Sequence, residues 1–312
     1  MHLEATQSVP ALAAPLNIQR RVELPTLGVA LVVHGGFLVL TVLFRGLPLL
    51  LSVPLGSLLL AWYGSLQHET IHGHPTSSRR FNRMLGALPL SLWIPYALYC
   101  ETHLRHHRHG GRHLTEVEHD PESFYLSAET MSKAGRVRRW MHAANCTLAG
   151  RLILGPGIAM MTFWAGELRK IVNGDRRRLR IWSAHAVGVG LVLAWTIGVC
   201  HIPLIVYFAL LVYPSVALTH LRSFAEHRAG ADSEQRTRVV EAHPLWALIF
   251  LNNNLHIAHH VNPKVPWYRL PDAWRQMRRA AQAQGLVFEG GYREVTQKYF
   301  LRGFISLDED GS

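Results

Sequence analysis

The chain has 312 residues, of which 49% are hydrophobic, and a formal net charge of +11. A strongly basic chain can bind nucleic acid, but we find no basic stripe interleaved with aromatic residues and expect no nucleic-acid partner. The 3 cysteines are scattered along the chain, a pattern that excludes a disulfide framework and a C-x-x-C site. Length and composition indicate one domain whose core is divided between a lipid bilayer and a polar region.

Residues 1–25 are polar and mixed in charge, and we expect an N-terminal cytoplasmic tail rather than a cleavable signal. Two stretches without Asp, Glu, Lys or Arg follow, separated by Arg45. A membrane-spanning helix needs roughly 20 predominantly apolar residues. The two stretches therefore predict spans over residues 26–44 and 47–66, joined in a hairpin by a short turn.

The first histidine motif, His68-Glu-Thr-Ile-His72, stands at the exit of the second predicted span. Histidines three or four residues apart project from one face of a helix, where imidazoles can bind a metal ion together. The motif also has the H-E-x-x-H pattern of zinc proteases, in which Glu69 would be the general base. A zinc metalloprotease is a distant alternative, because it would leave the later histidine motifs without a role.

The second motif, His103-Leu-Arg-His106-His107, lies between two apolar segments that are too short to span a bilayer. These segments, residues 84–100 and 152–166, contain prolines that would interrupt a helix in lipid. We expect both to be re-entrant or interfacial segments, so that the chain stays on one side of the membrane.

A third uncharged stretch is long enough for two spans, which we predict over residues 181–200 and 202–221. The third motif, His256-Ile-Ala-His259-His260, follows. An even number of crossings then separates the motifs, so all three can meet on one side of the membrane. Most arginines lie on that side, which the positive-inside rule makes the cytoplasmic side.

The three motifs together contain eight histidines, more than one four-coordinate zinc ion can use. The motifs therefore favour more than one metal ion, and by ligand type alone iron, copper, zinc and nickel are all compatible. Two other histidines, His34 and His185, stand alone within predicted spans. We expect these two to be neutral rings that hydrogen-bond to a neighbouring element.

In this order and spacing, the three motifs resemble those of the membrane-bound fatty-acid desaturase family, which includes hydroxylases and carotenoid ketolases. The segment Leu221-Arg-Ser-Phe-Ala-Glu-His227 is similar to the place where the family carries a further histidine. The proline-punctuated run that ends at Pro271 is similar to the one that follows the family's last motif. The resemblance covers roughly residues 25–285.

The resemblance implies an all-α integral membrane fold, with four transmembrane helices in two hairpins and a helical cytoplasmic cap that carries the motifs. We assign this membrane domain to residues 26–285 and a C-terminal tail to residues 286–312. In the family, the histidines hold two non-haem irons that use O2 as a co-substrate to attack an unactivated C–H bond of a lipid chain.

The metal ligands implied by the resemblance are His68, His72, His103, His106, His107, His227, His256, His259 and His260. We add Asn252 as a hypothetical ligand of the second iron, directly or through water, with a loop-ordering role as the alternative. Carboxylates near the motifs are expected to orient the imidazoles through their other ring nitrogen. The candidates, each of which can also be an ordinary surface carboxylate, are Glu69, Glu101, Asp120 and Glu226.

The resemblance implies an oxidoreductase, and we favour a fatty-acyl (acyl-lipid) desaturase. The first motif has three residues between its histidines, unlike the longer spacing of the acyl-CoA type. A lipid or carotenoid hydroxylase or ketolase of the same family stays open, because the pattern is shared. The sequence contains no haem or Cys-rich motif, so we expect electrons from an external donor of ferredoxin or cytochrome b5 type that docks on the basic cytoplasmic face.

Overall fold

The computed structural model describes residues 22–108, 115–116, 120–227 and 236–303. Within these ranges the chain is helical nearly throughout, and the strands β1 (Val239–Val240) and β2 (Val287–Phe288) form one short parallel pair. The predicted all-α class is therefore confirmed. Most of the predicted N-terminal tail and the end of the predicted C-terminal tail lie outside the described residues, so the domain boundaries stay predictions.

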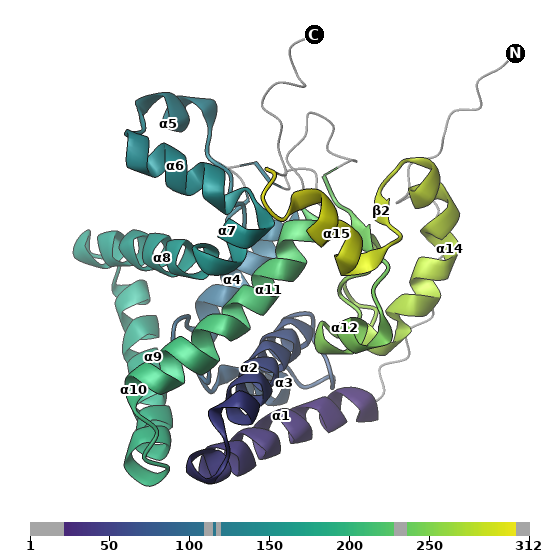
Figure 1. The fold of residues 1–312 in the computed structure, drawn as a ribbon. Coiled ribbons are helices and arrows are strands. Elements are labelled where there is room, and N and C mark those ends of the chain that lie inside the picture. The colour runs from purple at the N-terminus through teal and green to yellow at the C-terminus, as the bar shows by residue number, and fades with distance from the viewer. Residues whose placement is uncertain (1–21, 109–114, 117–119, 228–235, 304–312) are drawn as a thin grey trace, which may run out of the picture.

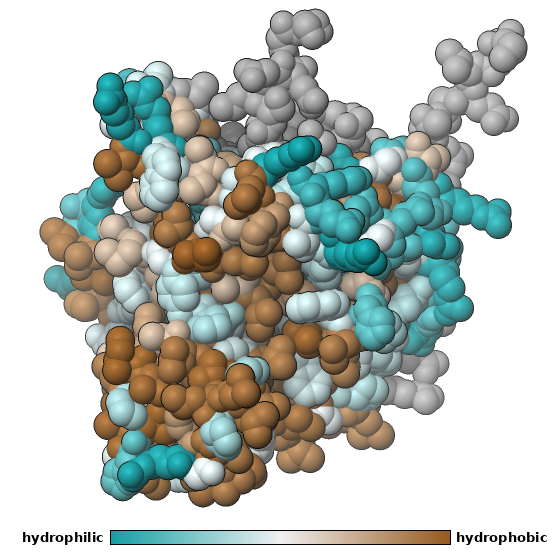
Figure 2. Space-filling model, in the orientation of Figure 1, coloured by the Kyte–Doolittle hydropathy of each residue, from teal (hydrophilic) through white to brown (hydrophobic). Residues whose placement is uncertain are grey.

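Four helical segments are long and apolar enough to cross a membrane, as the sequence predicts. They contain α1 (Leu24–Leu43), α2 (Leu49–Ile71), α9 (Arg176–Leu193), α10 (Leu204–Val206) and α11 (Tyr213–Glu226), with π-helical turns after α9 and before α11. Figure 1 shows their turns at the lower end of the molecule, where the surface in Figure 2 is mostly hydrophobic.

The third and fourth segments extend beyond the predicted spans at their polar ends. Asp175 caps α9, because its side chain accepts a hydrogen bond from the backbone N–H of Arg178 at 3.0 Å. The helix therefore begins in an arginine-rich turn before the uncharged stretch. In the same way, α11 continues to Glu226, so that His227 lies directly at its C-terminal end.

The spans pack through small residues and buried aromatic side chains. α2 packs against α1 and α11, and Gly56 allows a close approach, since a Cβ there would lie 2.8 Å from Leu211 Cδ2. Tyr63 and Tyr207 are fully buried in the same core. A side chain at Gly56 would require the Leu211 side chain to shift.

The predicted re-entrant or interfacial segment, residues 84–100, is helical only at its two ends, which belong to α3 (Arg79–Ala87) and α4 (Tyr96–His106). Backbone carbonyls without helical partners are tolerated at membrane depth only when protein groups bind them. Side chains from the surrounding helices supply hydrogen bonds to this segment: Tyr207 OH to Leu90 O (2.5 Å), His185 Nε2 to Leu92 O (2.8 Å) and Trp164 Nε1 to Trp93 O (2.8 Å). At the end of α3, His34 Nε2 binds Leu85 O (3.0 Å) and Tyr63 OH donates to Gly86 O (2.8 Å).

The remaining helices are shorter or more polar, and several occupy the upper part of the molecule in Figure 1. They are α5 (Ala128–Lys133), α6 (Arg136–Asn145), α7 (Leu148–Ile153), α8 (Gly155–Val172), α12 (Pro244–Ile249), α13 (His256–Val261), α14 (Leu270–Ala283) and α15 (Gly291–Tyr299). Pro156 does not interrupt α8, because it lies in the first turn, where a missing N–H has no cost. The apolar segment at residues 152–166 thus lies mostly in one helix, α8, on which Met161 is exposed.

Candidate metal centre

The structure brings the nine predicted histidines together in two groups. Within each group, one nitrogen from every ring lies within 4.8 Å of the others. The first group is His68, His72, His103, His107 and His259. The second group is His106, His227, His256 and His260.

Helix periodicity explains how one motif serves two groups. His256 and His260 are four residues apart on α13 and share a face, whereas His259 projects toward the first group. The same division separates His106 from His103 and His107 at the end of α4. The two groups are adjacent, since the rings of His107 and His260 stack with centroids 4.2 Å apart.

Within each group the Nε2 atoms face one another at short distances. The separations are 3.0 Å for His72 and His103, 3.2 Å for His107 and His259, 2.9 Å for His227 and His256, and 3.0 Å for His256 and His260. Adjacent ligands on one ion, with bonds of about 2.1 Å and right angles, lie roughly 3.0 Å apart. The rings are therefore spaced as neighbouring ligands of a metal ion are.

The other ring nitrogens determine where the protons lie. Nδ1 of His103 lies 2.9 Å from a Glu122 oxygen, Nδ1 of His106 lies 2.9 Å from Asp120 Oδ1, and Nδ1 of His256 lies 3.1 Å from Asn253 Oδ1. Each of these oxygens is an acceptor, so each Nδ1 carries the proton and donates it. The Nε2 lone pairs of these rings then point inward, where lone pairs facing one another require a cation between them.

The electrostatic environment keeps most of the rings neutral. Burial, and next the charge on neighbouring histidines, hold the pKa of His103, His256 and His259 well below the ordinary value for histidine. Burial also disfavours charge on His106, but Glu122 and Asp120 outweigh it and raise the pKa of that ring. Neutral imidazole is the form that binds metal, so the donor set fits a pair of divalent cations.

Three of the four predicted orienting carboxylates lie against histidine rings. Asp120 binds His106 as described, Glu226 lies 3.4 Å from His256 Nδ1, and Glu69 lies 3.6 Å from His68 Nδ1. Glu226 also forms an ion pair with Arg222 at 2.8 Å. All three carboxylates are buried, as expected for groups that hold rings in place.

The fourth predicted carboxylate, Glu101, faces away from the rings. It forms ion pairs with Arg177 at 2.9 Å and with Arg178, both in the first turn of α9. Glu101 precedes His103 by two positions on α4, which places their side chains on opposite faces of the helix. Glu101 therefore ties the helix of the second motif to α9.

The structure also distinguishes between neighbouring asparagines. Nδ2 of Asn252 donates to the carbonyl of Trp267 at 3.0 Å, whereas Asn253 lies between two rings, 3.1 Å from His68 Nε2 and 3.1 Å from His256 Nδ1. The hydrogen bonds thus connect Asn253, not Asn252, to the histidines. Sequence reasoning missed Asn253 and Glu122; the signal for Glu122 was its position two residues after Asp120.

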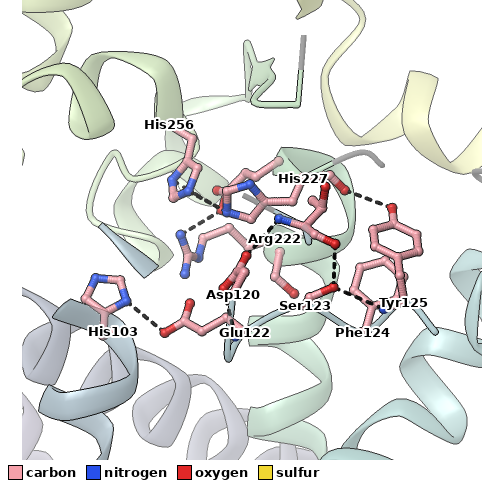
Figure 3. Close-up of a pocket in the computed structure, with 12 residues that line it drawn as sticks. His103, Asp120, Glu122, Ser123, Phe124, Tyr125, Arg222, His227 and His256 are labelled. Carbon is pink, nitrogen blue, oxygen red and sulfur yellow. Dashed lines mark hydrogen bonds and ion pairs between the residues drawn. The ribbon is translucent and has the colours of Figure 1, made fainter. Parts of the chain in front are cut away.

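A cavity of about 30 Å³ lies beside the second group (Figure 3). Its lining is polar on the side of the rings, with Asp120, Glu122, Arg222, His227 and His256 contributing. A space of this size admits a water molecule or two but not a lipid chain. The cavity therefore gives the second group access to small polar molecules.

Comparison of the sequence with family models matches residues 32–291 to the family described as Fatty acid desaturase. The matched range contains both histidine groups and all four candidate spans except the first turns of α1. A search of curated proteins gives no match.

Proposed function

The chain belongs to the fatty acid desaturase family, and from this we propose that it is a membrane di-iron, O2-dependent acyl-lipid desaturase that introduces a C=C bond into a lipid chain. Family membership supports an oxidoreductase in an integral membrane protein. The desaturation itself is our proposal. The observation that carries it is the convergence of nine imidazoles in two adjacent groups, close to where the apolar helices α2 and α11 end.

The first group would hold one non-haem iron and the second group the other. When bound, the iron pair supplies the oxidation by O2 of an unactivated C–H bond. The contribution of the chain is to fix the ligands before the metals arrive. Asp120, Glu122 and Asn253 bind the outward nitrogens and hold each ring in one tautomer, so that inward lone pairs need no reorganisation.

The location of the groups supports a lipid substrate. His68 and His72 end α2, and His227 directly follows α11, so the rings lie where two spans leave the apolar region. A lipid chain in the bilayer can approach this boundary without crossing water. In the non-helical segment before α4, the carbonyls of Leu90 and Leu92 accept hydrogen bonds from side chains of the third and fourth spans, which lowers the cost of placing this segment in lipid.

The distribution of arginines supports a cytoplasmic metal site. Arg105 and Arg108 are exposed beside the second motif, whereas Arg45 lies in the turn at the opposite end of α2. Under the positive-inside rule the motif side faces the cytoplasm. An external electron donor of ferredoxin or cytochrome b5 type, with an acidic surface, would dock on this face.

Expression in a desaturase-free host, followed by lipid extraction and mass spectrometry, tests the proposal. We expect a lipid product lighter by two hydrogens, which the His106→Ala variant does not form. His142→Ala is the matched control, because His142 lies on α6 and in neither group. A product heavier by one oxygen would instead assign a hydroxylase. If the His106→Ala variant still formed the product, the ligand assignment would be overturned.

A further inference from the structure

The two histidine groups are unequal in a way that leaves the second one short of a ligand. The first group has five rings and the second has four. The carboxylates nearest the second group act on outward nitrogens, since Asp120 binds Nδ1 of His106 and Glu226 lies against Nδ1 of His256. Both of these contacts are on the outward side of the second group.

Glu122 differs from these carboxylates because its two oxygens lie near rings of both groups. Oε1 binds the outward Nδ1 of His103, a member of the first group, at 2.9 Å. Oε2 lies 4.0 Å from Nε2 of His106, a member of the second group. Figure 3 shows Glu122 between His103 and the residues of the second group.

The nitrogen that Oε2 approaches is the inward one. Asp120 occupies Nδ1 of His106, so Nε2 carries the lone pair, and this buried atom has no hydrogen-bond partner among the described residues. Two ligands of one ion with bonds of about 2.1 Å lie at most roughly 4.2 Å apart. The separation of 4.0 Å therefore fits two ligands on nearly opposite sides of the same ion.

The backbone holds Glu122 in this position while its side chain keeps some freedom. The N–H of Glu122 donates to Asp120 Oδ1 at 2.9 Å, which fixes the segment against the second group. The side chain is 32% exposed and lines the cavity together with His227 and His256. The carboxylate can thus move within the cavity, and it must do so to act as a ligand, because it is not among the groups whose atoms all lie within 4.8 Å of one another.

We propose that Glu122 is a carboxylate ligand of the second metal ion, through Oε2, while Oε1 continues to orient His103. This inference rests on the proposed metal pair. One ion would then have only nitrogen ligands and the other a mixed set of nitrogen and anionic oxygen. The two ions would differ in charge and in preference for harder metals.

The alternative is that Glu122 only orients His103, and the two roles affect different ions. A ligand of the second group would weaken the second site when removed, whereas an orienting residue of His103 would weaken the first. Glu122→Gln separates them, because its amide oxygen still accepts from His103 Nδ1 but is a much poorer ligand than a carboxylate. Glu122→Asp keeps the carboxylate on a shorter side chain.

The experiment titrates chelator-stripped full-length protein with Co²⁺ and measures bound metal and visible absorption. The starting protein is expected to bind two Co²⁺. His72→Ala and His260→Ala then provide backgrounds in which the second or the first group alone is intact. We expect Glu122→Gln to weaken Co²⁺ binding at least about tenfold and shift the absorption in the His72→Ala background, but not in the His260→Ala background.

Glu122→Asp is expected to restore part of the lost affinity, and Glu129→Gln, an exposed glutamate paired with Lys133, should have no effect. Weakening confined to the His260→Ala background, or no weakening in either, would overturn the assignment of Glu122. Binding of fewer than two Co²⁺ by the starting protein would instead overturn the metal pair on which it rests. Lipid analysis is not needed for either conclusion.

Discussion

The histidines of this chain fall into two classes with opposite surroundings. His34 and His185 stand alone in α1 and α9, and their rings bind the backbone carbonyls of Leu85, near the end of α3, and of Leu92, in the non-helical segment before α4. Rings of the two groups instead face one another, as His227 and His256 do through Nε2, and His103, His106 and His256 bind oxygens through Nδ1. The comparison teaches that the partners of both ring nitrogens, rather than burial or membrane depth, separate a structural histidine from a metal ligand.

We expect the largest loss of bound iron and of product when a ring that faces two other rings is removed. His256→Ala removes the ring whose Nε2 lies 2.9 Å from His227 and 3.0 Å from His260. We expect bound iron to fall from two per chain to about one and lipid product to fall at least about 100-fold. Unchanged iron content, measured by mass spectrometry on purified protein, would break the distinction between the two classes.

A smaller loss of metal affinity is expected when the contact to the outward nitrogen of a ligand ring is changed. Asp120→Asn replaces the carboxylate that holds His106 with a neutral amide of the same shape. We expect metal affinity in the second group to fall about 10–100-fold with the fold retained. The exposed Asp272→Asn, on α14, serves as the control in the same Co²⁺ titration. Equal affinities in the two variants would show that the outward contact does not matter.

A lone histidine should affect stability and not metal content. His185→Ala leaves the Leu92 carbonyl without its side-chain donor, which costs about 1–3 kcal/mol when the group is buried. We expect a lower Tm in detergent and an unchanged two irons per chain. Val187→Ala on the same helix, where Val187 is exposed, should change neither quantity. Loss of iron in His185→Ala would move His185 into the class of metal ligands.

The smallest effect comes from an ion pair that involves no histidine. The hydrogen bond from Arg278 lowers the pKa of Glu241 below its ordinary value of 4.5, helped by Trp274. A lowered folded-state pKa stabilises the fold above the unfolded value, and this stability is lost as pH falls through the folded value. We expect Glu241→Gln to reduce the slope of Tm against pH below about pH 4.5. An unchanged slope would contradict this assignment.

The parts of the fold that follow from local pattern could be predicted from the sequence. The lengths of the uncharged stretches predicted the four spans. The spacing of three or four residues predicted that histidines such as His256 and His260 share one helix face. The division of the second and third motifs between two groups could not be predicted, because it depends on how α4 and α13 meet. Glu101 precedes His103 by two positions, from which it could have been predicted that Glu101 points away from the rings.

The loop before α13 shows why the rest could not be predicted. Leu251 and Asn252 both adopt positive φ, at 48° and 55°, a conformation that is uncommon for residues other than glycine. In this turn Asn252 binds the Trp267 carbonyl and Asn253 contacts the rings, so a residue count from His256 does not select the asparagine that contacts the histidines. Glu122 lies outside any helix, where no periodicity indicates a direction.

The most direct test of the central claim is metal analysis of the full-length protein purified from iron-replete cells. Two converging histidine groups predict two iron ions per chain, with a Mössbauer spectrum that contains two distinct iron environments. One zinc and no iron per chain would contradict the claim and would favour the H-E-x-x-H metalloprotease instead.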